Sequence, residues 1–168
     1  MTRLNLGCGY DIREGYINID KWKTHETVME VNLDLNILPF KTDDVEEILM
    51  LHIFEHLKEP MEFLKEMYRV SKNGAKWIIE VPYVTNTYQG TLTHLTKGFN
   101  ENTFTRYTKN IRKYNVGQKK YYSDIDLEIL KIELIPIGYQ KYLPFKGILK
   151  HFLNNIYANI RYELMVIK

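Results

Sequence analysis

A pair of glycines directly after an apolar stretch is the feature of this sequence that points most clearly to chemistry. Leu4-Asn5-Leu6 predicts a buried strand, and Gly7-Cys8-Gly9 follows it at once. Glycines at the end of a strand let a bulky ligand approach the backbone. Asp20 ends the next apolar run, where its carboxylate can accept hydrogen bonds from two ribose hydroxyls. Together these features predict a pocket for a nucleotide-like cofactor.

A second carboxylate, Asp34, follows the third apolar run and begins the segment Asp34-Leu35-Asn36-Ile37-Leu38-Pro39-Phe40. A loop at this position passes over the adenine of a bound nucleotide. Asp34 can then accept the exocyclic amino group while Leu35 packs on the ring. Alone, the segment is more typical of a helix cap or a surface turn. Its place after the glycines and Asp20 favours binding.

Two histidines and a glutamate lie in the segment Leu51–Leu57, where His52, Glu55 and His56 have the order H-x-x-E-H. On a helix this order is a zinc signature of metalloproteases. The apolar run Ile48–Leu51 predicts a strand leading into it, which disfavours a protease. A divalent metal held by these three residues, or purely structural roles for Glu55 and His56, both stay open. We expect no resident metal.

The elements that must position these residues alternate between strands and helices, which is typical of an α/β fold. Seven runs predict strands: Arg3–Leu6, Tyr16–Ile19, Thr27–Val31, Glu47–Leu51, Lys76–Val81, Leu127–Pro136 and Tyr162–Ile167. Only six residues separate Gly9 from Tyr16, whereas a parallel crossover normally needs a dozen or more. We therefore expect the first helices to be reduced to loops, and the exposed sheet face to be covered by another subunit.

The clearest helix is predicted from Pro60 to about Ser71, with Asn73-Gly74 as its left-handed stop. A second helix is expected to begin near Glu101 and to end before residue 117. A third is expected over Gly147–Ile160, between the last two strands.

The order of these features closely resembles that of class I S-adenosylmethionine-dependent methyltransferases, most of all the small type 11 branch. The order is strand, Gly-x-Gly, strand-Asp, Asp-x-x-x-Leu-Pro-Phe, strand, Glu-His-Leu, helix, Asn-Gly and strand, and it covers Leu4 to about Tyr83. The resemblance implies a Rossmann-like three-layer α/β sandwich with a mostly parallel seven-stranded sheet, an antiparallel last strand and reduced helices between the first strands. It also implies S-adenosylmethionine as cofactor and a single methyltransferase domain over residues 1–168.

Site residues follow from the resemblance by position. The cofactor-binding residues would be Asn5, Gly7, Cys8, Gly9, Asp20, Asp34, Leu35 and His52. The catalytic candidates are His94, His52 and His56, in that order, because a histidine can take a proton from a hydroxyl acceptor near neutral pH. Tyr83 and the polar loop Val84–Gly98 border the acceptor side, where such a loop can act as a lid. The expected reaction is methyl transfer to a small hydroxylated, sugar-like or phenolic acceptor.

Other functions stay open. The segment 106–122 mixes cations with tyrosines, and residues 106–168 carry 12 of the 23 Lys and Arg but 5 of the 21 Asp and Glu, so an RNA acceptor is the first alternative. The apolar and basic segment Leu143–Leu153 is typical of peripheral membrane contact, or of packing between the last strands or against a partner. A non-catalytic cofactor-binding partner subunit and a homo-oligomer are both compatible with the short early connections.

Composition limits the remaining classes. The 168 residues are 45% hydrophobic and 26% charged, as in one globular domain. The single cysteine, Cys8, excludes an internal disulfide, and no stretch approaches the roughly 20 apolar residues of a membrane span. A nicotinamide-dependent dehydrogenase is disfavoured because the glycine turn lacks a third glycine. The cytoplasm is the expected location.

Overall fold

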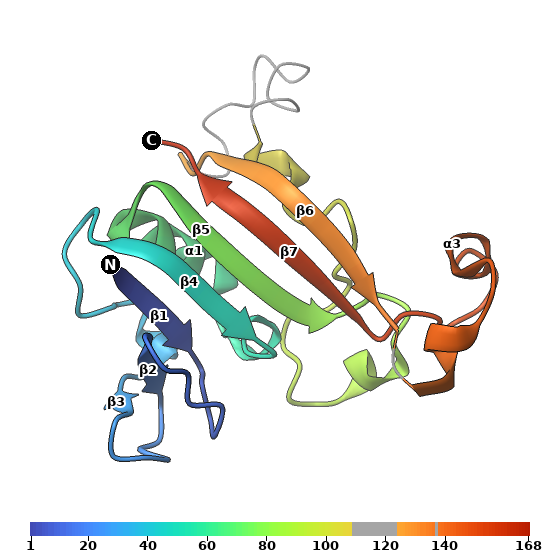
Figure 1. Ribbon diagram of the computed structural model, residues 1–168, viewed down its shortest axis with the longest axis horizontal. Coiled ribbons are helices and arrows are strands. Elements are labelled where there is room, and N and C mark those ends of the chain that lie inside the picture. The colour runs from blue at the N-terminus through green and yellow to red at the C-terminus, as the bar shows by residue number, and fades with distance from the viewer. Residues whose placement is uncertain (109–123, 137) are drawn as a thin grey trace.

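The computed structural model describes residues 1–108, 124–136 and 138–168 and contains one seven-stranded sheet (Figure 1). The strands are β1 (Thr2–Leu6), β2 (Ile17–Asp20), β3 (Met29–Glu30), β4 (Val45–Leu51), β5 (Ser71–Pro82), β6 (Leu127–Ile135) and β7 (Asn159–Val166). Their order across the sheet is β3-β2-β1-β4-β5-β7-β6, and only β7 pairs antiparallel with its neighbours. The seven predicted strands and the antiparallel last strand are therefore confirmed.

Regular helix is scarce among the described residues. α1 spans Pro60–Val70 and begins at Pro60, as predicted. It ends earlier than expected because Ser71 already has an extended backbone, so Asn73-Gly74 lies in the first part of β5 and is not the helix stop. The other helices are short: η1 (Leu33–Leu35), η2 (Phe54–His56), η3 (Thr87–Gly90), η4 (Thr105–Tyr107), η5 (Gly138–Tyr142) and α3 (Lys146–Leu149). No described helix is long and apolar enough to cross a membrane.

The predicted third helix is wrong over most of its length. Of Gly147–Ile160, only the first residues belong to α3. Asn155 has a φ angle of 59°, in the left-handed region that interrupts a right-handed helix. Of the second predicted helix, η4 and the turn before it are described, and residues 109–116 lie outside the described residues.

The hydrophobic core lies on the face of the sheet that α1 covers; α1 is seen behind β4 and β5 in Figure 1. Leu4, Ile48 and Trp77 are register partners on β1, β4 and β5, and all three are fully buried on this face. Phe63 and Met67 of α1 pack into the same cluster. This packing fixes the order of the central strands, and with it the positions of the loops at their C-terminal ends.

The opposite face of the sheet carries no helix in the described part of the chain (Figure 1). Ion pairs replace apolar cover there: Lys76 Nζ lies 2.6 Å from Glu163 Oε2, and Arg161 Nη2 lies 2.6 Å from Glu80 Oε2. The described residues thus form two layers rather than three, which extends the predicted reduction of helices to the whole face. The covering subunit that the short connections led us to expect stays a prediction.

Candidate cofactor pocket and active site

The glycine bend after β1 leaves the backbone bare at the C-terminal end of that strand. Gly7 and Gly9 have φ angles of 65° and 52°, which glycine adopts readily. A Cβ on Gly7 would lie 2.8 Å from the Cβ of Ile53, so only glycine fits against the segment that follows β4. Around Gly9, no described atom comes within 4 Å of such a Cβ. The bend is therefore closed on one side and open to a ligand on the other.

Asp20 ends β2 with its carboxylate against the glycine bend. Its Oδ2 accepts a hydrogen bond from Gly9 N (2.8 Å), and its Oδ1 accepts one from Trp22 N (3.0 Å). These bonds fix the carboxylate, and each oxygen keeps a lone pair for a further donor. Such an arrangement suits the two adjacent hydroxyls of a ribose.

Gly7, Asp20 and Asp34 line one pocket with a volume of about 170 Å³ at the C-terminal ends of the parallel strands. Its full lining is Gly7, Asp20, Lys21, Asn32, Leu33, Asp34, Ile53, His56 and Leu57. Ligands of open α/β sheets bind at this edge. Three groups that lie on separate connections of the chain therefore converge on one site.

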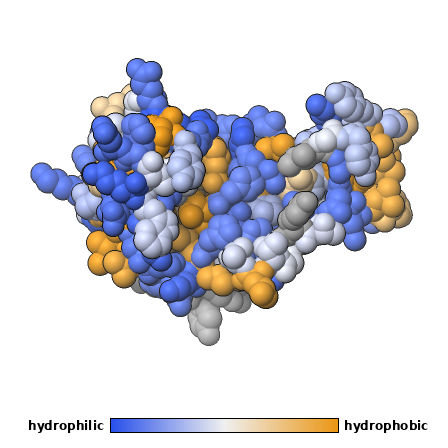
Figure 2. Space-filling view, turned by 90° about the horizontal axis from the view of Figure 1, so that it is seen from below, coloured by the Kyte–Doolittle hydropathy of each residue, from blue (hydrophilic) through white to orange (hydrophobic). Residues whose placement is uncertain are grey.

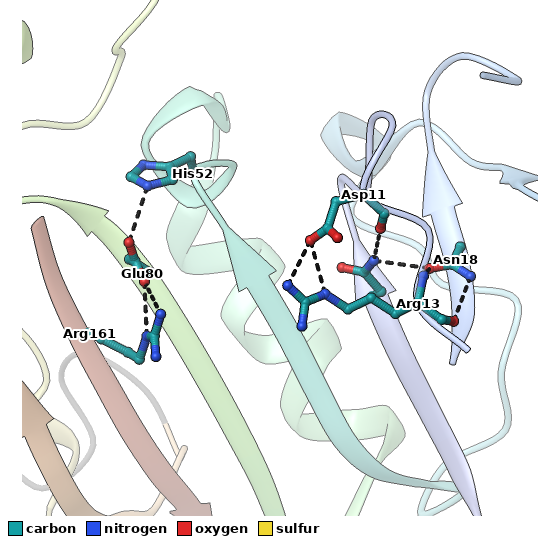
Figure 3. Close-up of polar contacts among 7 residues, drawn as sticks. Asp11, Arg13, Asn18, His52, Glu80 and Arg161 are labelled. Carbon is teal, nitrogen blue, oxygen red and sulfur yellow. Dashed lines mark hydrogen bonds and ion pairs between the residues drawn. The ribbon is translucent and has the colours of Figure 1, made fainter. Parts of the chain in front are cut away.

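Several predicted cofactor-binding residues lie outside that lining, namely Asn5, Cys8, Gly9, Leu35 and His52. The amide of Asn5 donates to Asp11 O (2.7 Å) and to Asn18 Oδ1 (3.0 Å), so this side chain holds the β1–β2 connection (Figure 3). Cys8 is buried, and its backbone N–H donates to Ile19 O (3.0 Å). These contacts support the glycine bend from the side that does not line the pocket.

Leu33, rather than Leu35, supplies the apolar lining after β3. Leu33 is 5% exposed and lines the pocket, whereas Leu35 is 66% exposed. Asn32 orients this turn, because its Oδ1 accepts a hydrogen bond from Asp34 N (3.2 Å). The lining residues that sequence reasoning missed are Lys21, Asn32, Leu33, Ile53 and Leu57. Each lies within two positions of a predicted site residue, and that proximity is the signal that points to them.

The family comparison matches residues 4–79 to the type 11 model described as a methyltransferase domain. The matched stretch contains every residue that lines the pocket. Over residues 4–79, the chain therefore matches the type 11 family of methyltransferase domains. The match indicates a transferase, and S-adenosylmethionine stays the expected cofactor.

Solved structures show the same fold for this chain at low sequence identity. An S-adenosylmethionine-dependent methyltransferase from Mesorhizobium loti is 8% identical with a TM-score of 0.62, over 98% of this chain and 90% of that one. A SAM-dependent methyltransferase from Archaeoglobus fulgidus is 19% identical with a TM-score of 0.55, over 99% and 86%. A chain from a complex that contains the Haloferax volcanii Trm112 methyltransferase activator is 14% identical with a TM-score of 0.61, over 99% and 82%. A comparison with curated proteins gave no match.

His52 lies between two buried carboxylates at the end of β4. Its Nδ1 is 3.4 Å from Glu55 Oε1. Its Nε2 is 3.3 Å from Glu80 Oε1 (Figure 3). The contacts with Glu55 and Glu80 raise the pKa of the imidazole to about 9, although burial on its own would lower it. At neutral pH both ring nitrogens therefore carry protons. That state makes His52 a hydrogen-bond donor, which does not fit its predicted role as a base.

Glu80 connects His52 to β7. Its Oε2 accepts hydrogen bonds from Arg161 Nε (2.8 Å) and Nη2 (2.6 Å) (Figure 3). Its Oε1 accepts one from Asn159 Nδ2 (2.9 Å). Burial on its own would raise the pKa of Glu80, but the bonds from His52 and Arg161 outweigh it and lower the pKa to about 2. The carboxylate is therefore ionised throughout the physiological range.

The low pKa of Glu80 predicts a pH-dependent contribution to stability. Because the folded-state pKa lies below the ordinary 4.5, the contribution is complete above about pH 5 and is lost as the pH falls toward 2. Its size at neutral pH is on the order of 3 kcal/mol. In Glu80→Gln, urea unfolding should show a free energy that changes less between pH 7 and pH 3 than in the wild type. Glu128→Gln, at an exposed carboxylate on β6, is the control. Equal pH profiles for wild type and Glu80→Gln would contradict the expectation.

His56 and His94 form a pair of imidazoles at the edge of the pocket. His56 lines the pocket, and its ring centroid lies 4.8 Å from that of His94. The loop that carries His94 is held there, because Leu95 N and Thr96 N both donate to Glu55 O (2.9 and 3.0 Å). The structure thus brings two of the three predicted catalytic histidines into contact and keeps His52 in a separate network.

Tyr83 and Tyr107, which lies at the start of the basic segment, make contacts within the chain and away from the pocket. Tyr83 is buried, and its hydroxyl donates to Glu101 Oε2 (3.1 Å); burial and the Glu101 charge raise the pKa of Tyr83 to about 12. Tyr107 is half-buried, with its hydroxyl 2.8 Å from Met61 Sδ. Of the predicted RNA-binding segment 106–122, the structure describes residues 106–108, and the rest lies outside the described residues.

Proposed function

We propose that this protein transfers a methyl group from S-adenosylmethionine to a hydroxyl oxygen of a small sugar-like or phenolic acceptor. The observation that carries the proposal is the imidazole pair at the pocket edge, where His56 contacts both the pocket and His94. The segment that carries His94 is fixed beside His56 by its backbone bonds to Glu55, and this restriction next to the pocket favours a small acceptor over a polymer.

The cofactor roles follow from the pocket. Asp20 would accept the ribose hydroxyls, Asp34 would accept the adenine amino group, and Leu33 would pack on the ring. The bare backbone from Gly7 to Gly9 would lie under the methionine part. The sulfonium methyl is already activated, so the protein mainly has to align the acceptor and exclude water, which can lower a barrier by roughly 7–11 kcal/mol.

The transfer breaks the bond between sulfur and the methyl carbon and forms a bond between that carbon and the acceptor oxygen. The hydroxyl proton has to leave, and the His56–His94 pair is placed to accept it. General-base catalysis of this kind contributes on the order of 10²–10⁴-fold. S-adenosylhomocysteine and a methyl ether are the products.

Incubation with S-adenosylmethionine and panels of phenols, sugars and short RNAs tests the proposal. We expect S-adenosylhomocysteine to form with a hydroxylated small molecule, whose mass rises by one methylene. Methylation of RNA alone would overturn the acceptor class in favour of the first alternative. Cofactor binding without turnover on any acceptor would favour the non-catalytic partner subunit.

A second proposal concerns the segment 138–153, which forms a protruding lobe around α3. Six of its large apolar side chains are more than half exposed: Tyr139, Tyr142, Phe145, Ile148, Phe152 and Leu153. Figure 2 shows hydrophobic residues gathered at this end of the molecule. The segment contains lysines but no acidic residue. This exposure contradicts packing between the last strands, and with the positive charge it favours contact with an anionic membrane surface.

Vesicle binding tests this lobe. Phe145→Asp/Phe152→Asp should weaken co-sedimentation with phosphatidylcholine–phosphatidylserine vesicles by about tenfold, because it replaces apolar anchors with negative charge. Leu92→Asp, at an equally exposed apolar residue on a different loop, is the matched control. If the wild-type protein does not bind these vesicles, the membrane proposal is wrong, and a protein partner becomes the better explanation of the exposed lobe.

A further inference from the structure

A second group of side chains in this molecule has the composition of a metal site. Glu55, His56 and His94 each offer one ligand atom, and these atoms all lie within 4.8 Å of one another. Glu55 and His56 belong to η2, and His94 lies on the loop that docks against it. The group differs from the one considered from sequence, since His52 is replaced by a histidine 42 positions further along the chain.

The Glu55 carboxylate is buried without a hydrogen-bond partner among the described residues. Its side chain is 1% exposed, and neither carboxylate oxygen has a hydrogen-bond partner among the described residues. The charged ring of His52 lies 3.4 Å from Oε1 and compensates the charge on that side, so Oε2 is the oxygen without any partner among the described residues. A buried carboxylate oxygen without a partner is costly. A metal ion bound at Oε2 would satisfy it.

His56 is already oriented as a metal-binding histidine. Its Nδ1 lies 2.9 Å from Thr93 O, and a carbonyl oxygen can only accept, so Nδ1 carries the proton in the neutral ring. Nε2 is then left with its lone pair free for a metal. Hydrogen bonding of the second ring nitrogen to a backbone carbonyl is the usual support of a metal-bound histidine.

We propose that Glu55, His56 and His94 bind a divalent transition-metal ion of the zinc type. Two imidazoles and one carboxylate are ligands that zinc prefers, whereas magnesium and calcium require mainly oxygen ligands. Zinc bonds of about 2.0–2.2 Å require the ligand atoms to move closer than they are now, which rotation of the two partly exposed rings provides. Three protein ligands leave one position of a tetrahedral ion open.

The ion would join the loop of His94 to the end of β4 at the edge of the cofactor pocket. In the metal-loaded protein the imidazole pair could not take a proton, and the ion would instead lower the pKa of a coordinated hydroxyl. The inference concerns metal binding and does not depend on the proposed acceptor.

Calorimetric titration of the untagged, metal-stripped protein with zinc chloride tests this site. We expect one ion per chain, and the cobalt-substituted protein should show the intense visible bands of a tetrahedral ion. His94→Gln should weaken zinc binding at least tenfold, and Glu55→Gln should do the same. His151→Gln, at an exposed histidine of the α3 lobe, should bind zinc as the wild type does.

Wild-type protein that binds no zinc, or His94→Gln that binds it unchanged, would overturn the metal site. Binding of S-adenosylhomocysteine, measured on the same samples, separates this result from a failure of the methyltransferase proposal. Zinc should also slow hydrogen exchange of residues 91–96 in the wild type and not in His94→Gln. Unchanged exchange would contradict a shared ion.

Discussion

Replacement of Asp20 by alanine is expected to reduce the affinity for S-adenosylhomocysteine by at least 100-fold. A hydrogen bond to a charged group contributes about 1.5–3 kcal/mol, and the carboxylate is placed to accept two from the ribose. Each 1.4 kcal/mol corresponds to a factor of ten in the dissociation constant. The loss of Asp20 also frees Gly9 N, which now donates to Oδ2 at 2.8 Å, so the glycine bend loses its anchor.

Isothermal titration of purified variants with S-adenosylhomocysteine measures this effect. Asp20→Asn separates the two contributions, because the amide oxygen can still accept from Gly9 N while the negative charge is lost. Glu26→Ala, at an exposed carboxylate on the same β2–β3 connection, is the matched control and should bind as the wild type does. Retained affinity in Asp20→Ala would refute the assignment of the pocket to the cofactor.

The convergence of Gly7, Asp20 and Asp34 on one pocket was predictable because its signals are local. Gly7 follows directly on the strand that it ends, and Asp20 and Asp34 each follow an apolar run. In a parallel sheet, residues after neighbouring strands meet at one edge, so correct strands bring their loops together. The place of Leu33 in the pocket lining could not be predicted, because a single 3₁₀ turn decides which side chain faces inward and sequence periodicity does not resolve one turn.

The environment of His52 could not be read from the sequence. The carboxylate on its Nε2 comes from Glu80 on β5, and Asn159, whose amide lies 3.2 Å from the same nitrogen, is 107 positions away on β7. These contacts exist because the antiparallel β7 returns beside β5 and places Asn159 opposite Pro82. Whether His52 acts as a base or as a hydrogen-bond donor depends on these distant neighbours. The sequence therefore predicted that His52 follows β4, but it could not predict the protonation state of the imidazole.

Gly7→Ala is expected to lower the free energy of unfolding by about 2–5 kcal/mol. A left-handed backbone costs a non-glycine residue about 1–2 kcal/mol, and the φ of Gly7 is 65°. The new methyl group would also overlap Ile53, which lies 2.8 Å away, and overpacking of this kind costs a further 1–3 kcal/mol. Urea denaturation followed by tryptophan fluorescence, with Trp77 fully buried in the core, measures the loss.

Gly9→Ala is the matched variant that separates the two causes. Gly9 has a similar φ of 52°, but a Cβ there would meet no described atom within 4 Å. It should therefore lose only the backbone contribution, so that Gly7→Ala exceeds it by the cost of the contact with Ile53. Equal losses would mean that the segment after β4 yields freely, and the closed side of the pocket would then not be rigid. A larger loss at Gly7 would show that Gly7 packs against Ile53 so closely that only a hydrogen atom fits between them. This contact would then hold the glycine bend in place for a ligand.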